Sequence, residues 1–211
     1  MTYTVLTYGD SNTHGTPPMG SRDPHPRLAR RWPVVMAETS GVDLIEEGLP
    51  GRLAAGHGDP FMGAHMDGQL GLRIALASHG PIDLLTIMLG SNDLQGHHGK
   101  TAAQIASHAD ALVKMALEVE IQDRHGGFQV LLICPPVAIS SGTFAPDFVG
   151  AEETSNTLPA LYAANAQKRG VHFLNAGAHI ASSPIDGVHF DEAAHETLGQ
   201  AVADQIKTIL I

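Results

Sequence analysis

Cysteine and long apolar runs are both scarce in this sequence. Its 211 residues include a single cysteine, Cys134, so no disulfide can form within the chain. Cys134 ends the apolar run 130–134, where a buried and unreactive thiol is expected. No apolar stretch approaches the length that spans a membrane, and the first residues lack the basic and long apolar segments of a secretory signal. These absences predict a cytoplasmic location.

Positive charge is also scarce. Lysine and arginine number 12 against 22 acidic residues, which gives a formal net charge of −10. Such a charge repels phosphate backbones and anionic lipid headgroups, so we expect neither a nucleic-acid partner nor a membrane partner. With 43% apolar and 16% charged residues, the composition is that of an ordinary globular protein. The length suits a single domain, residues 1–211, with one hydrophobic core.

Five short runs have the composition of β-strands and are bounded by turn-forming residues: 4–8, 43–46, 84–89, 129–134 and 171–175. Three of these runs are almost wholly apolar. Strands of this kind are typical of a parallel sheet whose two faces are both covered. We therefore expect helices on each side of a five-stranded parallel sheet.

Helical patterns lie between these strands. The clearest follows Thr101, where Thr101-Ala102-Ala103-Gln104 has the spacing of a capping box. One face of that helix is expected to carry Ile105, Ala109, Leu112, Ala116 and Val119. The C-terminal segment repeats the pattern with Leu198, Val202, Ile206 and Ile209, and weaker helices are expected at 32–39, 68–77 and 151–168. The order predicts an α/β fold, a three-layer α/β/α sandwich with right-handed crossovers.

Three long segments rich in Gly, Pro and His follow predicted strands: 11–31, 49–65 and 135–150. In open α/β sheets, ligands bind beyond the carboxyl ends of the strands. The three segments are therefore expected to converge on one site.

Two polar clusters at this edge could form a catalytic triad. Gly9-Asp10-Ser11 directly follows the first strand, which would expose Ser11 in the crevice. Asp186-Gly187-Val188-His189 precedes the last helix, and Asp186 at this spacing can orient the His189 imidazole as a base. Each cluster taken alone is also ordinary turn chemistry. Their shared location at one edge favours a site.

Donors for a developing oxyanion are found after the second and third strands. Gly48-Leu49-Pro50-Gly51 and Gly90-Ser91-Asn92-Asp93 both fall at the same predicted edge. Acyl transfer needs hydrogen-bond donors aimed at the oxygen that becomes negative. The Asn92 amide and the backbone N–H groups of Gly51 and Ser11 could supply them.

These four blocks together resemble the signature blocks of the SGNH (GDSL-type) hydrolase family, in matching order and spacing across essentially the whole chain. The segments 45–49, 87–93 and 186–190 and the pair Arg31-Trp32 are similar to the bacterial arylesterase branch. The resemblance implies a flavodoxin-like SGNH fold and a serine esterase acting on short-chain acyl or aryl esters. Some members of that branch also transfer acyl groups to alcohols or peroxide, and relatives commonly form homo-oligomers.

Carried over residue by residue, the resemblance implies Ser11 as nucleophile, His189 as base and Asp186 as its orienting partner. It implies an oxyanion hole formed by Ser11, Gly51 and Asn92, and no metal or organic cofactor. One departure concerns the residues after the serine, where this chain has Asn12 in place of an aliphatic residue and His14 where an aromatic is common. Asn12 and His14 are therefore candidates for substrate binding.

Other interpretations of the same patterns remain open. The 13 histidines show neither the helical i, i+4 spacing nor the Cys/His clustering of a zinc site. An α/β-hydrolase would place its nucleophile in Gly-x-Ser-x-Gly, which the sequence does not contain. A flavodoxin-like protein that binds a small ligand without catalysis is the non-enzymatic alternative.

Overall fold

The computed structural model describes residues 2–21, 26–56 and 63–210. Its centre is a parallel sheet of five strands in the order β2-β1-β3-β4-β5. The strands are β1 (Thr4–Gly9), β2 (Asp43–Gly48), β3 (Leu84–Met88), β4 (Gln129–Cys134) and β5 (His172–Asn175). In the register, Gly9 at the end of β1 lies between Gly48 of β2 and Met88 of β3. The segments that follow these three strands therefore start side by side.

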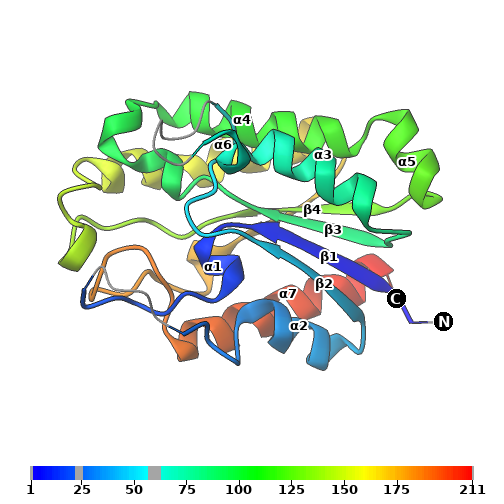
Figure 1. Cartoon of the computed structure of the whole chain (residues 1–211), viewed down its shortest axis with the longest axis horizontal. Coiled ribbons are helices and arrows are strands. Elements are labelled where there is room, and N and C mark those ends of the chain that lie inside the picture. Colours follow the sequence, from blue (N-terminus) through cyan, green and yellow to red (C-terminus); the bar gives the residue numbers. More distant parts are fainter. Residues whose placement is uncertain (1, 22–25, 57–62, 211) are drawn as a thin grey trace.

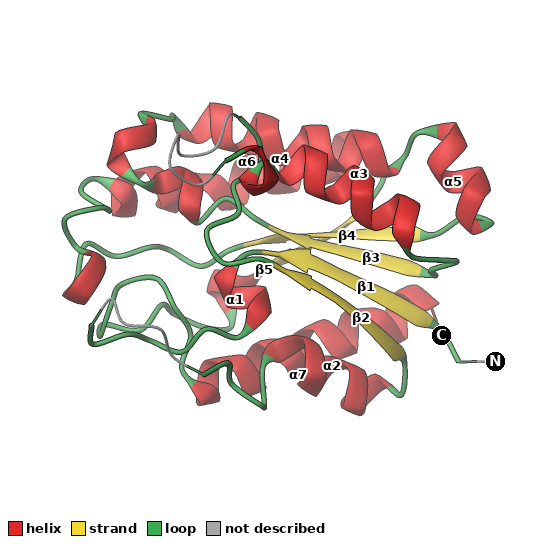
Figure 2. Ribbon diagram, in the orientation of Figure 1, coloured by secondary structure: helices red, strands yellow, loops and turns green. Residues whose placement is uncertain are grey.

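Helices cover both faces of the sheet, which confirms the predicted three-layer α/β/α sandwich (Figure 1). Two helices, α2 (Trp32–Ser40) and α7 (Glu192–Leu210), pack together on one face. The opposite face carries α3 (Gly68–Ser78), α4 (Ala102–Ala116), α5 (Val119–His125) and α6 (Ala151–Arg169). Figure 2 shows the long loops gathered at the end of the sheet opposite to the two chain termini.

Apolar side chains alternate between two core clusters, one on each face of the sheet. Leu6, Leu85 and Leu132 belong to the cluster under α3, α4 and α6, whereas their neighbours Val5, Leu84 and Leu131 belong to the cluster under α2 and α7. This burial on both faces explains why the strands lack polar alternation. Cys134 is fully buried, and burial raises the pKa of its thiol to about 12. An unreactive thiol is what this environment produces.

The helix after Thr101 begins as predicted but ends earlier. Thr101 and Gln104 form a capping box, in which each side chain bonds the other's backbone N–H. The helix stops at Ala116, because Glu118 adopts an extended conformation and starts a new helix in a different direction. Val119 was therefore placed wrongly on the buried face: its side chain is 73% exposed. Within the described residues, no helix is both long and apolar enough to cross a membrane.

A buried histidine links the two helices on the α2/α7 face. His195 of α7 is 0% exposed, and its Nδ1 accepts a hydrogen bond of 3.2 Å from the backbone N–H of Trp32, the first residue of α2. Its Nε2 is buried without a hydrogen-bond partner. A second proton would give the ring a positive charge that water cannot reach, so burial lowers the pKa of His195 to about 4.

His195 is expected to make stability depend on pH. The unfolded chain binds a proton on an ordinary histidine below about pH 6.5, whereas the folded chain binds it only below about pH 4. Stability therefore rises with pH across this window, by about 3 kcal/mol for His195 alone. His195→Asn keeps an acceptor for Trp32 and should flatten the rise. Urea unfolding of both proteins at pH 4.5 and pH 7 gives the change in the free energy of unfolding between the two pH values. An equal change in the wild type and in His195→Asn would contradict the role assigned to His195.

Candidate active site

The chain turns sharply into a one-turn helix, α1 (Ser11–His14), directly after β1. The sequence predicted an irregular segment from Ser11 onward, and this turn is a correction. Asp10 caps the helix by accepting the Asn12 N–H at 2.9 Å. The helix folds back so closely on the strand ends that a Cβ on Gly9 would lie 2.0 Å from Thr13 Oγ1. Glycine at position 9 therefore allows Ser11 to stand at the edge of the sheet.

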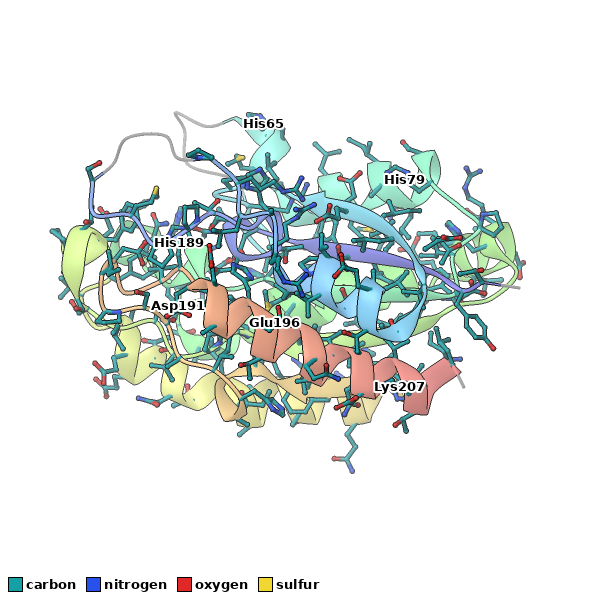
Figure 3. The ribbon with its side chains drawn as sticks, turned by 90° about the horizontal axis from the view of Figure 1, so that it is seen from below. His65, His79, His189, Asp191, Glu196 and Lys207 are labelled. Atoms are coloured by element: carbon teal, nitrogen blue, oxygen red, sulfur yellow. The ribbon has the colours of Figure 1, made fainter. Side chains whose placement is uncertain are left out.

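Ser11, His189 and Asp186 form a continuous hydrogen-bonded line. His189 Nε2 lies 3.0 Å from Ser11 Oγ, and His189 Nδ1 lies 2.7 Å from Asp186 Oδ2. All three side chains are buried. In Figure 3, His189 lies on the side of the long loops, ahead of α7, whose far end is marked by Lys207. With Asp186 as acceptor at Nδ1, the tautomer that donates there leaves Nε2 free to accept the Ser11 proton.

Both oxygens of the Asp186 carboxylate accept hydrogen bonds. Its Oδ1 accepts the backbone N–H groups of Val188 and His189 at 3.0 and 2.9 Å, and its Oδ2 also accepts the N–H of Met19 at 2.8 Å. Burial by itself would raise the pKa of Asp186, but the hydrogen bond and charge of His189 and the backbone donors outweigh it and hold the pKa below its usual value. The loop turns through Gly187 at φ 86°, a conformation that favours glycine.

Asn92 follows β3 and has a fixed amide orientation. Its Nδ2 donates to the backbone oxygen of Arg52 at 3.1 Å and lies 3.4 Å from Asp10 Oδ2. Its Oδ1 accepts a bond of 3.2 Å from Gln95 Nε2. The amide nitrogen is therefore directed to the side on which the strand ends meet. Gln95 was not singled out from the sequence, and Asp10 was quoted only as part of Gly9-Asp10-Ser11 without a role of its own, because neither residue type is distinctive in a turn.

One pocket of about 270 Å³ joins the predicted residues. Ser11, Gly51, Asn92 and His189 all line it. Its remaining walls are mostly apolar and come from the three long loops, from the segment that follows Asn92 and from the loop before His189: Thr16, Met19, Pro50, Gln95, Phe144, Phe148 and Val188. The Phe144 ring stands edge-on to the His189 ring at 5.8 Å between centroids. Polar groups at one end and apolar walls elsewhere suit a small, largely uncharged ligand.

Asn12 and His14 do not line this pocket, and their expected role in substrate binding stays a prediction. The Asn12 side chain is buried and donates to the backbone oxygen of Val188 at 3.2 Å, which ties α1 to the loop before His189. His14 lies at the other end of the helical turn, with its Nδ1 3.3 Å from Thr16 Oγ1. Of the α1 residues, only Ser11 lines the pocket.

Two buried charges support the loops that carry the donors. Asp93, which is 0% exposed, accepts the Ala54 N–H at 2.8 Å and the Lys100 ammonium at 2.6 Å. Burial would raise the pKa of Asp93, but His108 and Lys100 beside it lower the pKa below its usual value. Arg52 stacks over the Tyr8 ring at 4.2 Å and donates to the Gly9 oxygen at 3.0 Å. These contacts fasten the segment with Gly51 to the ends of β1 and β3.

Among the described residues, no group of three or more His, Cys, Asp or Glu side chains is arranged to hold a metal ion. The groups that the site does present are the hydrogen-bonded line from Ser11 to Asp186 and the donors facing it. Nucleophile, base and orienting carboxylate in this arrangement are suited to acyl transfer.

Comparison with known proteins points the same way. The chain matches the model of the GDSL-like lipase/acylhydrolase family over residues 7–197. Among solved structures it is similar to the M. smegmatis aryl esterase, with 33% identity, a TM-score of 0.90 and coverage of 99% of this chain and 100% of that one. It is similar to Est24, a carbohydrate acetylesterase from Sinorhizobium meliloti, with 34% identity, a TM-score of 0.89 and the same coverage.

A putative arylesterase from Agrobacterium tumefaciens is also similar, with 32% identity, a TM-score of 0.85 and coverage of 99% of this chain and 100% of that one. A search of curated protein sequences gave no match. Each of these three alignments covers essentially the whole of both chains.

Proposed function

Since the chain belongs to the GDSL-like lipase/acylhydrolase family, and is thus a carboxylic ester hydrolase of small-molecule esters, we propose that it cleaves short-chain acyl or aryl esters through an acyl-Ser11 intermediate. The observation that carries the proposal is the line from Ser11 Oγ to His189 at 3.0 Å and on to Asp186 at 2.7 Å. A serine hydroxyl is a weak nucleophile until a base takes its proton, and His189 is within reach to do so.

In the proposed reaction, Ser11 Oγ attacks the ester carbonyl while His189 Nε2 accepts the hydroxyl proton. The carbonyl oxygen becomes an oxyanion, which the N–H groups of Ser11 and Gly51 and the Asn92 amide stabilise. Collapse of this intermediate breaks the ester bond, and His189 returns the proton to the leaving alcohol. Water then attacks acyl-Ser11 with His189 again as base, which releases the acid and restores Ser11. Asp186 holds the imidazole in place and stabilises its transient positive charge.

The pocket supports a small, neutral substrate. At about 270 Å³ it lies at the lower end of ligand pockets, and Phe144, Phe148 and Met19 give it apolar walls. An acetyl-like or aryl group fits this description, and two similar structures are described as an aryl esterase and a carbohydrate acetylesterase.

The acceptor need not be water. Apolar walls reduce the local concentration of water, so an alcohol or peroxide that enters can attack acyl-Ser11 instead. We include this transfer in the proposal, and a new ester or a peracid among the products would reveal it. The homo-oligomeric state stays a prediction.

Covalent labelling tests the nucleophile directly. Wild-type protein that hydrolyses p-nitrophenyl acetate is treated with a p-nitrophenyl phosphonate and analysed by intact mass and peptide mapping. We expect one adduct per chain on Ser11, together with complete loss of turnover, because the phosphonate mimics the tetrahedral intermediate.

Other serines serve as internal controls for this experiment. Ser91 and Ser183 are also buried, at 6% and 7% exposure, but neither lines the pocket. An adduct on one of them would assign the nucleophile elsewhere. A folded protein with neither turnover nor adduct would favour the non-catalytic, flavodoxin-like binding protein.

A further inference from the structure

Asp10 contacts both α1, the helix that presents Ser11, and the proposed oxyanion donor Asn92. We infer that it is a positioning residue for the Asn92 amide as well as the cap of α1. The inference rests on the proposed function, because it acts through Asn92 as an oxyanion donor. In this role Asp10 neither contacts the substrate nor takes part in proton transfer.

The two oxygens of Asp10 have different tasks. The carboxylate is 1% exposed, with Oδ1 accepting the Asn12 N–H at 2.9 Å and Oδ2 facing Asn92 Nδ2 at 3.4 Å. A cap needs only one acceptor, and the burial of a carboxylate is costly. The second oxygen is therefore the feature that capping leaves unexplained.

The surroundings of Asn92 show what the second oxygen does. Two acceptors, Asp10 Oδ2 and the Arg52 carbonyl at 3.1 Å, lie on the nitrogen side of the amide, and the Gln95 donor lies at 3.2 Å on the oxygen side. A flipped amide would place oxygen against two acceptors and nitrogen against a donor. The arrangement thus keeps Nδ2 at the strand ends, and because its contact to Asp10 at 3.4 Å is longer than its bond to Arg52 at 3.1 Å, the N–H on the Asp10 side can be shared with an oxyanion.

The charge of Asp10 suits this role at neutral pH. Burial raises the pKa of Asp10 to about 6, with Asp93 acting in the same direction, while the Asn12 N–H, His189 and Arg52 oppose the rise. Above this value the group is a carboxylate that can only accept hydrogen bonds. A protonated Asp10 would carry a donor, which cannot hold the amide nitrogen in the same way.

Capping alone makes a different prediction from positioning. Asp, Asn and Ser are nearly equivalent as N-caps, so a purely structural Asp10 should tolerate either replacement. Asp10→Asn keeps one acceptor oxygen but cannot accept both bonds, and Asp10→Ser keeps the cap and removes the second oxygen entirely. If the second oxygen positions Asn92, both variants should lose turnover while they remain folded.

A double-mutant cycle on p-nitrophenyl acetate hydrolysis at pH 7.5 tests the coupling. Asn92→Ala alone should lower kcat by about 10² to 10³, the usual loss for one oxyanion donor. Asp10→Asn alone should lower kcat by at least about tenfold with little change in KM, because the loss falls on the transition state. In the Asn92→Ala background, Asp10→Asn should change kcat by less than about threefold, since the group that it positions is gone.

The possible failures are distinguishable. If Asn92→Ala turns over like the wild type, Asn92 is not an oxyanion donor, and the proposed function of that residue falls together with the inference. If Asn92→Ala is impaired but Asp10→Asn is either harmless or equally damaging in both backgrounds, only the inference is overturned. Thermal unfolding and near-UV circular dichroism check each variant, and Asp10→Ser completes a second cycle should Asp10→Asn not fold.

Discussion

Ser11→Ala is expected to lower kcat for ester hydrolysis by on the order of 10⁶, the loss typical of removing a serine nucleophile from a triad. The methyl group that remains cannot form an acyl-enzyme, and His189 then has no hydroxyl within the 3.0 Å contact to activate. The rest of the pocket stays in place, so a residual rate above that of water should persist. Steady-state turnover of p-nitrophenyl acetate and loss of the phosphonate adduct measure the effect.

A buried serine far from the pocket provides the matched control. Ser155 lies in α6 at 3% exposure, and its hydroxyl donates to the Ala151 oxygen one turn earlier. Ser155→Ala removes the same atom from a similarly buried position without touching the pocket. It should retain wild-type turnover, whereas substantial activity in Ser11→Ala would show that another residue attacks the ester.

The fold was predictable because its signals are local or periodic. The three central strands β1, β3 and β4 are short, mostly apolar runs, and parallel strands buried on both faces need no alternation. The capping box at Thr101 and Gln104 involves residues three apart, so a short local segment of the sequence determines it. The register of β1 with β2 and β3 then brings Ser11, Gly51 and Asn92 to one edge, as the order of the motifs indicated.

Side-chain directions at the site were less predictable. A serine two residues after the end of a strand can continue in a loop or start a helix. Here it starts α1, which turns Asn12 towards Val188 and His14 towards Thr16. This turn is why neither side chain lines the pocket, and their contact with substrate stays a prediction. No pattern in the sequence gives the direction of these side chains, because the contact that fixes Asn12 is made with Val188, 176 positions away.

Pocket walls and buried charges depend on contacts between distant segments. Phe144 and Phe148 reach the pocket from the loop after β4, and convergence of the loops was predicted without identifying either ring. The Asp93–Lys100 pair joins residues seven apart, but its purpose appears only with Ala54, which lies 39 positions before Asp93 and donates to the same carboxylate. Such groups can be found in three dimensions by asking how each buried charge is satisfied.

Asp186→Asn is expected to lower kcat by about 10⁴ while leaving the protein folded. The carboxylate offers two oxygens to four donors, of which His189 Nδ1 at 2.7 Å and the Met19 N–H at 2.8 Å share Oδ2. An amide replaces one oxygen by a donor. It either favours the tautomer in which His189 Nε2 carries the proton and cannot act as base, or turns its donor towards the backbone N–H groups of Val188 and His189.

Asp191→Asn is the matched control, because it makes the same replacement five residues later. Asp191 is exposed, and its Oδ1 accepts the Ala194 N–H at 2.8 Å at the start of α7, a cap that asparagine also provides. Turnover of p-nitrophenyl acetate should therefore fall in Asp186→Asn and persist in Asp191→Asn. Equal turnover in both variants would mean that His189 does not depend on Asp186 for its tautomer, and the roles proposed for this loop would have to be reassigned.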